Sequence, residues 1–182
     1  MSFLKKKTVW AALGTEGLIG PYFFQKKDDE GNVKKDDEGN VKTINSEHYS
    51  NLLKRKFLLA LRRKGIGMTQ VWFQQDGAAP NTAQVVLQWL GRTFDTRLIP
   101  WKSDRPWPTH FPDLSPLDFF LWFHLKERVY KVNPTSIEGL KLSISQEMRN
   151  IAREMCYSAV TNFVKRVVLL RRRNGRHFKY ML

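Results

Sequence analysis

The sequence predicts an α/β fold in a single domain, and three features point to it. The first is a strand, turn and helix in succession. The strand is expected at residues 69–76, with its β-branched and aromatic run starting at Val71, and Gly77 with Pro80 breaks it. The second is a pair of strand-like segments near the start of the chain. The third is a series of apolar residues at helical spacing between residues 45 and 167. Alternation of this kind is typical of an α/β protein.

The composition indicates a folded and strongly basic protein. With 182 residues, of which 42% are hydrophobic and 13% aromatic, the chain can bury a sizeable core. Lys and Arg number 31 against 17 Asp and Glu, so the net charge is +14 and the pI is about 10.1. This excess favours a polyanionic partner, nucleic acid before a membrane, and the alternative is a basic surface that serves solubility.

Three absences in the sequence predict a soluble intracellular protein. Cys156 is the single cysteine, so no internal disulfide can form and a reducing compartment is expected. No apolar run is long enough to span a membrane, and residues 1–7 lack the apolar core of a signal peptide. We therefore expect no membrane partner.

The N-terminal part is predicted to form a β-hairpin followed by an exposed loop. Strands are expected at residues 8–13 and 18–25, with a turn between them, and Pro21 makes the second an edge strand or one with a bulge. Residues 26–41 are the sequence KKDDEGNV repeated in tandem. We interpret the repeat as a duplication in an exposed connection, because solenoids need more units to bury a core.

A helix is predicted to begin at Asn45 and Ser46 and to end before Gly65. Cations gather in its last turns, among them Arg62 and Arg63, where the helix dipole favours positive charge and explains part of the cluster. The apolar residues expected on its buried face are Tyr49, Leu52, Leu53, Phe57 and Leu61.

The next helix is expected to begin at Asn81 or Thr82. A short strand at residues 97–101 and an ordered loop over residues 102–115 follow it. Two tryptophans of this region either stack on bases or pack against the core. The buried face of the helix is expected to carry Ala83, Val86, Leu87 and Leu90, and the two tryptophans are Trp101 and Trp107.

A buried helix is predicted to start in a capping box, with Ser115 as its N-cap, Pro116 in its first turn and Asp118 three residues after the cap. Apolar residues then cover most of its circumference, which is typical of a helix buried on all sides. These residues are Phe119, Phe120, Leu121, Trp122, Phe123 and Leu125.

The C-terminal part, residues 135–182, is predicted to be helical and basic. It starts with a capping box of Thr135 and Glu138, and a last helix is expected from about Ser158. No acid follows Glu154, so this end is the most basic surface of the chain. The apolar faces carry Ile137, Leu140, Ile144, Met148 and Ile151 in the first helix, and Val160, Phe163, Val164 and Val167 in the second. The candidate DNA contacts are Arg62, Arg63, Lys165, Arg166, Arg171, Arg172, Arg173 and Arg176.

Two carboxylates are candidates for metal binding, Asp76 at the end of a strand and Asp118 in the first turn of a helix. Acids on rigid elements around a phosphodiester can hold divalent metals that activate water or a 3′-hydroxyl, and Mg²⁺ needs only one or two of them besides substrate phosphates. Each acid has a structural alternative, an Asx turn before Gly77 for Asp76 and helix capping for Asp118. The scattered histidines fit no zinc motif, and no phosphate loop is present, so no small-molecule cofactor is expected.

Several segments together resemble one family. QQDGAAPNTA (residues 74–83), followed by WPTHFPDLSPLDFFLWFHLKERVY (residues 107–130), is similar to the catalytic domain of mariner-like transposases of the DDE/D superfamily. VWAALGTEGLIGPYFF (9–24), VKTINSEHY (41–49) and GRHFKYML (175–182) also resemble this family. The likeness covers nearly the whole chain outside the duplicated copy.

The resemblance implies a fold, a chemistry and a cofactor. The fold is a ribonuclease-H-like mixed sheet flanked by helices, with further helices at the C-terminus. Asp76 is by this likeness the second catalytic acid and Asp118 the third, and both bind Mg²⁺ or Mn²⁺ for DNA cleavage and strand transfer. Asn81 stands where many relatives have His, which changes the surroundings of the metal.

The sequence departs from the family pattern before Val9. There the family has helix-turn-helix units and a first central strand with the first catalytic Asp, whereas residues 1–7 contain no acid. We therefore expect a truncated catalytic domain that lacks its first central strand and has little or no activity. Unpaired strand edges rearrange easily, so either the strand at residues 9–13 pairs with residues 71–75 or the sheet stays split.

The resulting functional hypothesis is a truncated mariner-like transposase catalytic domain that binds DNA, from a lineage that performs DNA transposition. The alternatives are a non-enzymatic basic DNA-binding remnant and a transposon-derived product without a function. DNA is the expected partner, together with either a second copy of the chain or an intact transposase. The expected location is the nucleus.

Overall fold

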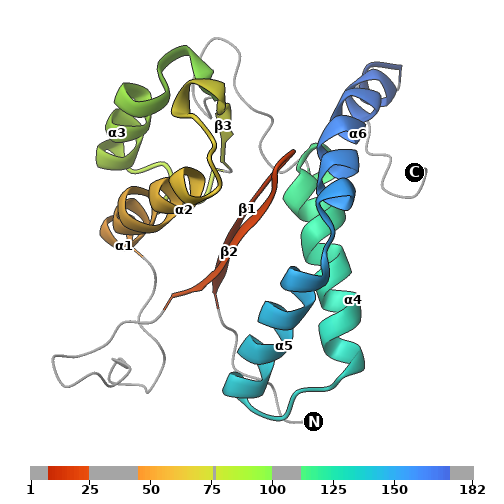
Figure 1. The fold of residues 1–182 in the computed structure, drawn as a ribbon. Helices are drawn as coiled ribbons and strands as arrows, with labels where there is room; N and C mark the ends of the chain where they lie inside the picture. Colours follow the sequence, from red (N-terminus) through yellow and green to blue (C-terminus); the bar gives the residue numbers. More distant parts are fainter. Residues whose placement is uncertain (1–7, 25–44, 76, 100–111, 173–182) are drawn as a thin grey trace, which may run out of the picture. The chain divides into compact units, whose positions relative to one another are not determined.

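The computed structural model describes residues 8–24, 45–75, 77–99 and 112–172, which contain helices and two sheets of two strands each (Figure 1). The predicted α/β class is confirmed. Backbone contacts divide the chain into two units: unit 1 is Met1–Phe24 with Phe111–Leu182, and unit 2 is Gln25–His110. The assignment of residues 1–182 to a single domain stays a prediction.

Unit 1 contains the predicted hairpin. Strand β1 (Val9–Gly14) pairs antiparallel with β2 (Gly17–Phe23), and Thr15 with Glu16 forms the turn between them. A two-residue connection suits the twist of a hairpin, and Gly17 has the positive φ of 97° that glycine tolerates. The turn is also tied to the C-terminal half of the unit, because Arg153 forms an ion pair with Glu16 at 2.8 Å.

The bulge expected from Pro21 is present in the hairpin. Trp10 pairs with Tyr22 and Ala12 with Ile19, so a single residue of β1 faces both Gly20 and Pro21. Gly20 has a φ of 110°, and a Cβ atom at this position would lie 2.9 Å from the carbonyl oxygen of Trp10. Only glycine fits this bulge without strain.

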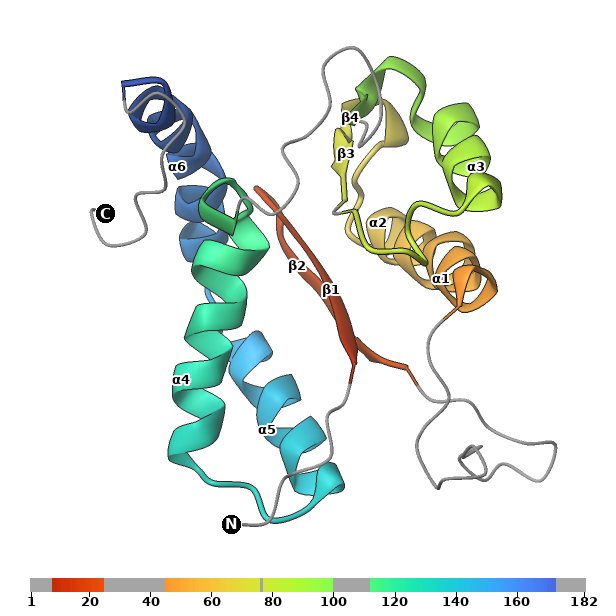
Figure 2. The ribbon, with the colours of Figure 1, turned by 180° about the vertical axis from the view of Figure 1, so that it is seen from behind.

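Helices cover the hairpin within unit 1. Two short segments, η4 (Pro112–Leu114) and the π-helical η5 (Leu117–Trp122), lead into α4 (Phe123–Lys131). Helices α5 (Ile137–Asn150) and α6 (Arg153–Arg172) follow, and both contact β2 (Figures 1 and 2). The buried core of the unit combines the hairpin with all these helices and consists of Ala11, Leu121, Leu125, Met148, Ile151 and Cys156.

Three predictions for the helices of unit 1 are wrong in detail. The helix after Ser115 is buried along one stripe and not on all sides. Leu121 and Leu125 lie on this stripe and belong to the core of unit 1, whereas Phe123 lies off the stripe and is 62% exposed. The N-cap of α5 is Ser136 and not Thr135, since the Ser136 hydroxyl accepts from the N–H of Gly139 at 3.0 Å. Helix α6 begins at Arg153 and not near residue 158.

Unit 2 opens with one long helix made of α1 (Ser46–Leu52), the π-helical η1 (Leu53–Phe57) and α2 (Leu58–Arg63). The predicted start is confirmed, because Asn45 accepts from the N–H of His48 at 3.0 Å. Gly65, with a φ of 70°, ends the helix, and Ile66 donates back to the carbonyl of Leu61 at 3.0 Å. All five predicted apolar positions are buried: Tyr49, Leu52, Leu53, Phe57 and Leu61.

The strand of unit 2 is shorter than predicted. Residues 68–70 form the short helix η2 (Met68–Gln70). Of the strand residues that the structure describes, only β3 (Phe73–Gln74) pairs, parallel to β4 (Leu98–Ile99). Phe73 packs between Phe57 and Phe94, with ring centroids at 5.5 and 4.9 Å. These contacts hold the sheet against the long helix and against α3 (Gln84–Phe94).

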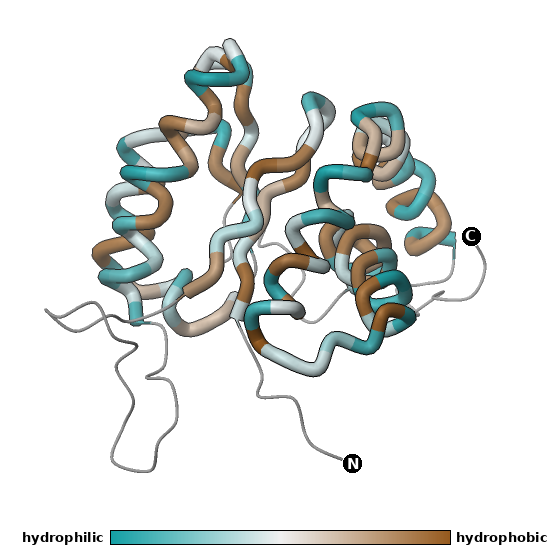
Figure 3. The backbone as a smooth tube through the Cα atoms, turned by 60° about the horizontal axis from the view of Figure 1, so that its bottom comes forward, coloured by the Kyte–Doolittle hydropathy of each residue, from teal (hydrophilic) through white to brown (hydrophobic). Residues whose placement is uncertain are grey.

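Helix α3 has Ala83 at its N-cap position, so the predicted caps Asn81 and Thr82 are wrong. Both residues belong to the preceding turn, where their N–H groups donate to the carbonyl of Ala78 at 2.9 and 3.1 Å. The apolar face is confirmed at Val86 and Leu90, which are fully buried. Hydrophobic and hydrophilic segments alternate along the helices of the described chain, as the periodicity predicts (Figure 3).

The described residues form two separate sheets, which is the second of the two arrangements expected for a sheet without its first strand. β1 pairs with β2, and β3 pairs with β4. The two sheets thus match the α/β class, and the ribonuclease-H-like arrangement stays an expectation from the resemblance.

None of the described helices has both the length and the apolar character that crossing a bilayer requires.

We predict that Gly20→Ala lowers the free energy of unfolding by about 1–3 kcal/mol, because the new Cβ meets the Trp10 carbonyl in a backbone conformation that alanine avoids. Gly14→Ala is the matched control in the same hairpin, where no atom lies within 4 Å of an added Cβ, and it should change stability by less than about 1 kcal/mol. Urea unfolding of both variants measures the difference. Equal losses would contradict the bulge geometry.

Candidate metal and nucleic-acid sites

The segment that leads to Asp76 is held by a buried hydrogen-bond chain. Gln75, which is 8% exposed, accepts at Oε1 from the Tyr49 hydroxyl at 2.8 Å and donates from Nε2 to the carbonyl of Asn81 at 2.8 Å. The Gln75 side chain therefore links the long helix of unit 2 to the turn after the strand. Asp76 itself lies outside the described residues. The preceding residue, Gln75, is held by these two hydrogen bonds, which sequence periodicity did not predict.

Asp118 lies exposed in the first turn of the helix that starts at Pro116. Its N–H donates to the backbone carbonyl of Ser115 at 2.9 Å and lies 3.4 Å from the Ser115 hydroxyl, so the predicted N-cap is confirmed. Asp118 belongs to η5, and π-helical turns often occur at functional sites. An exposed carboxylate on a capped turn fits both predicted roles, helix capping and metal binding.

The donor chemistry of the two acids fits Mg²⁺ or Mn²⁺, since hard divalent cations prefer carboxylate oxygens. Asp118 falls in unit 1 and Asp76 in the sequence of unit 2. Among the residues that the structure describes, no three His, Cys, Asp or Glu side chains gather into a metal-binding group. The metal site of the resemblance stays a prediction that depends on Asp76 and Asp118.

Arg166 is not a surface cation, and we withdraw it from the candidate DNA contacts. It is 7% exposed, its Nη1 donates to the carbonyl of Asp113 at 3.0 Å, and its guanidinium lies 3.7 Å from the ring centroid of Phe119. Burial lowers the pKa of Arg166, and the Asp113 carboxylate opposes this shift. An arginine keeps its charge in such a place, because its pKa starts far above neutrality.

The sequence analysis placed Arg166 on the surface and did not single out Asp113, which is 2% exposed. A signal for Arg166 was present: the buried residues Cys156 and Ala159 with the half-buried Phe163 form a helical stripe, and three residues further along it stands Arg166. The predicted apolar face included Val164, which is exposed. A buried arginine inside an apolar stripe marks a packing contact.

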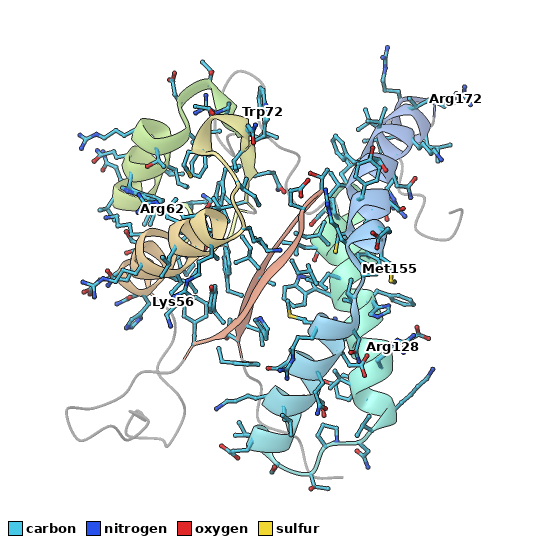
Figure 4. All side chains as sticks on the ribbon, in the orientation of Figure 1. Lys56, Arg62, Trp72, Arg128, Met155 and Arg172 are labelled. Atoms are coloured by element: carbon cyan, nitrogen blue, oxygen red, sulfur yellow. The ribbon has the colours of Figure 1, made fainter. Side chains whose placement is uncertain are left out.

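The remaining described candidates for DNA contact are exposed. Arg62 lies near the end of the long helix of unit 2, and Arg172 lies at the C-terminal end of α6 (Figure 4). Phosphate contacts need cations that reach solvent, so these side chains keep their predicted role. The exposed candidates are Arg62, Arg63, Lys165, Arg171 and Arg172. Arg173 and Arg176 lie outside the described residues, as do Trp101 and Trp107.

The long helix of unit 2 carries further exposed cations about two turns before Arg62. These are Lys54, Arg55 and Lys56, the last of which Figure 4 labels. Lys54 also lies over the ring of Trp89, with its Nζ 5.7 Å from the ring centroid. The cations thus extend beyond the last turn, where a helix dipole alone would concentrate them.

Comparison of the chain with protein-family models found no match, and comparison with curated proteins found none either.

We predict that Tyr49→Phe lowers the free energy of unfolding by about 1–3 kcal/mol, because it leaves the buried Oε1 of Gln75 without this donor. Tyr130→Phe is the control, since Tyr130 is exposed, and it should cost less than about 0.5 kcal/mol. Thermal unfolding of the two variants gives the comparison. A loss in Tyr49→Phe no larger than in the control would show that the hydrogen bond does not hold this segment.

Proposed function

We propose that this chain is part of a mariner-like transposase catalytic domain, binds DNA, and descends from enzymes that cleave and join DNA with divalent metals. Asp76 and Asp118 are the metal-binding acids of the proposal, and the metal is Mg²⁺ or Mn²⁺. The observation that carries it is the combination of QQDGAAPNTA with SPLDFFLW, the motifs that contain the two acids. The exposed position of Asp118 on a capped turn supports it.

The DNA-binding part of the proposal rests on exposed cations in each unit. Arg62 and Arg63 end the long helix of unit 2, and Arg171 and Arg172 end α6 of unit 1. Both pairs stand at helix C-termini, where the dipole adds negative potential that phosphate would have to overcome. Long arginine side chains reach beyond the helix end, so they can meet phosphates without reading sequence.

The bound metal would supply Lewis-acid stabilisation of the charge that develops on the phosphate. The residues of this chain would hold the acids in place: Ser115 orders the turn before Asp118, and Gln75 fixes the backbone before Asp76. Within residues 1–182 the resemblance places two catalytic acids and not the three of the family. We therefore expect residues 1–182 to bind DNA and to have little or no cleavage activity.

The proposal includes a nuclear location and a protein partner, which is either a second copy of this chain or an intact transposase. The competing function is a non-enzymatic DNA-binding protein with the same cations and no metal chemistry. Binding and cleavage assays separate the two, and a chain without any function would fail both.

We predict that the double variant Arg171→Gln, Arg172→Gln weakens binding to duplex DNA and lowers the slope of log K against log salt by about 2, since each phosphate contact contributes about 0.9. Gel shifts over a range of salt concentrations measure the slope. Arg128→Gln, Arg149→Gln removes the same charge from exposed residues outside the candidate surfaces and is the control. Equal slopes would mean that net charge, and not these arginines, governs binding.

We predict that residues 1–182 nick labelled duplex DNA in Mn²⁺ no faster than the variants Asp76→Asn and Asp118→Asn. The reason is that Asp76 and Asp118 are two of the three acids of the family's metal site and do not complete it. Single-strand breaks are counted on denaturing gels at equal DNA occupancy. Metal-dependent nicking that either variant abolishes would contradict the expected inactivity and establish an enzyme. DNA binding without nicking in all three proteins agrees with the proposal.

A further inference from the structure

We propose that Arg166 is a positioning residue for Asp118: its guanidinium joins the two ends of the turn that presents this carboxylate. The inference rests on the proposed function, because it assigns Asp118 to metal binding. It concerns a residue that the sequence placed on the DNA-binding surface and that the structure places in the interior of unit 1.

The contacts of Arg166 bracket the turn from both sides. Asp113, whose carbonyl accepts from Nη1 at 3.0 Å, precedes the N-cap Ser115. Phe119, whose ring centroid lies 3.7 Å from the guanidinium carbon, follows Asp118 directly. A single planar group on α6 therefore touches the residues before and after the capped turn. Displacing the guanidinium would remove one contact from each end of the turn.

The chemistry of arginine suits this double contact. A guanidinium donates hydrogen bonds in its plane while its face stacks on an aromatic ring, and both occur here at once. A lysine ammonium at this position would keep the charge, but it is a compact point charge without a planar face. Arg166→Lys thus removes the geometry and retains the cation.

The same contacts connect α6 to the candidate metal acid. Helix α6 contacts η4 within unit 1, and it ends in Arg171 and Arg172, which belong to the proposed DNA-binding surface. Arg166 is less than two turns before these residues on the same helix. Groups that orient metal ligands typically change metal affinity about 10–100-fold when they are replaced. Arg166 should therefore affect Mn²⁺ binding without touching the ion.

The test uses Mn²⁺ as a paramagnetic probe of the full-length ¹⁵N-labelled chain. Mn²⁺ bound at Asp118 broadens the amide signals of residues 115–119, and a titration gives the apparent affinity. Asp118→Asn should remove this local broadening. Arg166→Lys should weaken the apparent Mn²⁺ affinity at these signals about tenfold or more, while the amide spectrum of the hairpin and of α5 stays that of the folded protein.

A matched control is Arg149→Lys, which makes the same exchange at an exposed position of α5 and should leave the affinity within about twofold. If Arg166→Lys loses the folded spectrum of unit 1, Phe119→Leu provides the same test, because it removes the ring and keeps the guanidinium. Weaker Mn²⁺ binding in this folded variant supports the inference.

Two negative results have different meanings. Wild-type affinity in folded Arg166→Lys or Phe119→Leu overturns the positioning role and leaves the metal site intact. Absence of local broadening in the wild type, or its persistence in Asp118→Asn, overturns the metal role of Asp118 and the positioning role with it.

Discussion

Both units of this chain depend on one constraint: a sheet of two strands is only marginally stable in water by itself. Each sheet is stabilised by aromatic and aliphatic side chains that helices supply. In unit 2 the ring of Phe73 packs between Phe57 and Phe94. In unit 1 the hairpin joins a core with α4, α5 and α6. The buried faces of the helices therefore decide where the strands, and the candidate acids beside them, are held.

The interior of unit 1 includes the charged guanidinium of Arg166, and burial of a charge costs free energy. Removal of water from a guanidinium disfavours its charged form, as the lowered pKa of Arg166 reflects. The cost is offset by the Asp113 carbonyl, the ring of Phe119 and the nearby Asp113 carboxylate. These contacts join α6 to η4 and η5 within unit 1. Arg166 thereby gives α6 a structural role beside its proposed contact with phosphate.

The two candidate acids follow similarly ordered residues in the sequence, although they belong to different units. Each follows a residue whose side chain orders a turn: Ser115 before Asp118 and Gln75 before Asp76. Metal ligands need such support, because a carboxylate with free rotation loses entropy when it binds an ion. The described contacts supply this order at Ser115 and at Gln75.

Four features can be predicted from the amino-acid sequence: the α/β class, the hairpin with its bulge, the buried face of the long helix in unit 2 and the cap at Ser115. These features follow from local rules, namely periodicity, turn residues and capping side chains, which act within a few residues. Three features follow from the packing of the folded chain and not from the sequence pattern: Phe123 is exposed, α6 begins at Arg153 and Arg166 is buried. Those outcomes depend on what packs against each face. Arg166 meets Asp113 across 53 positions of sequence, a distance over which no local pattern carries information.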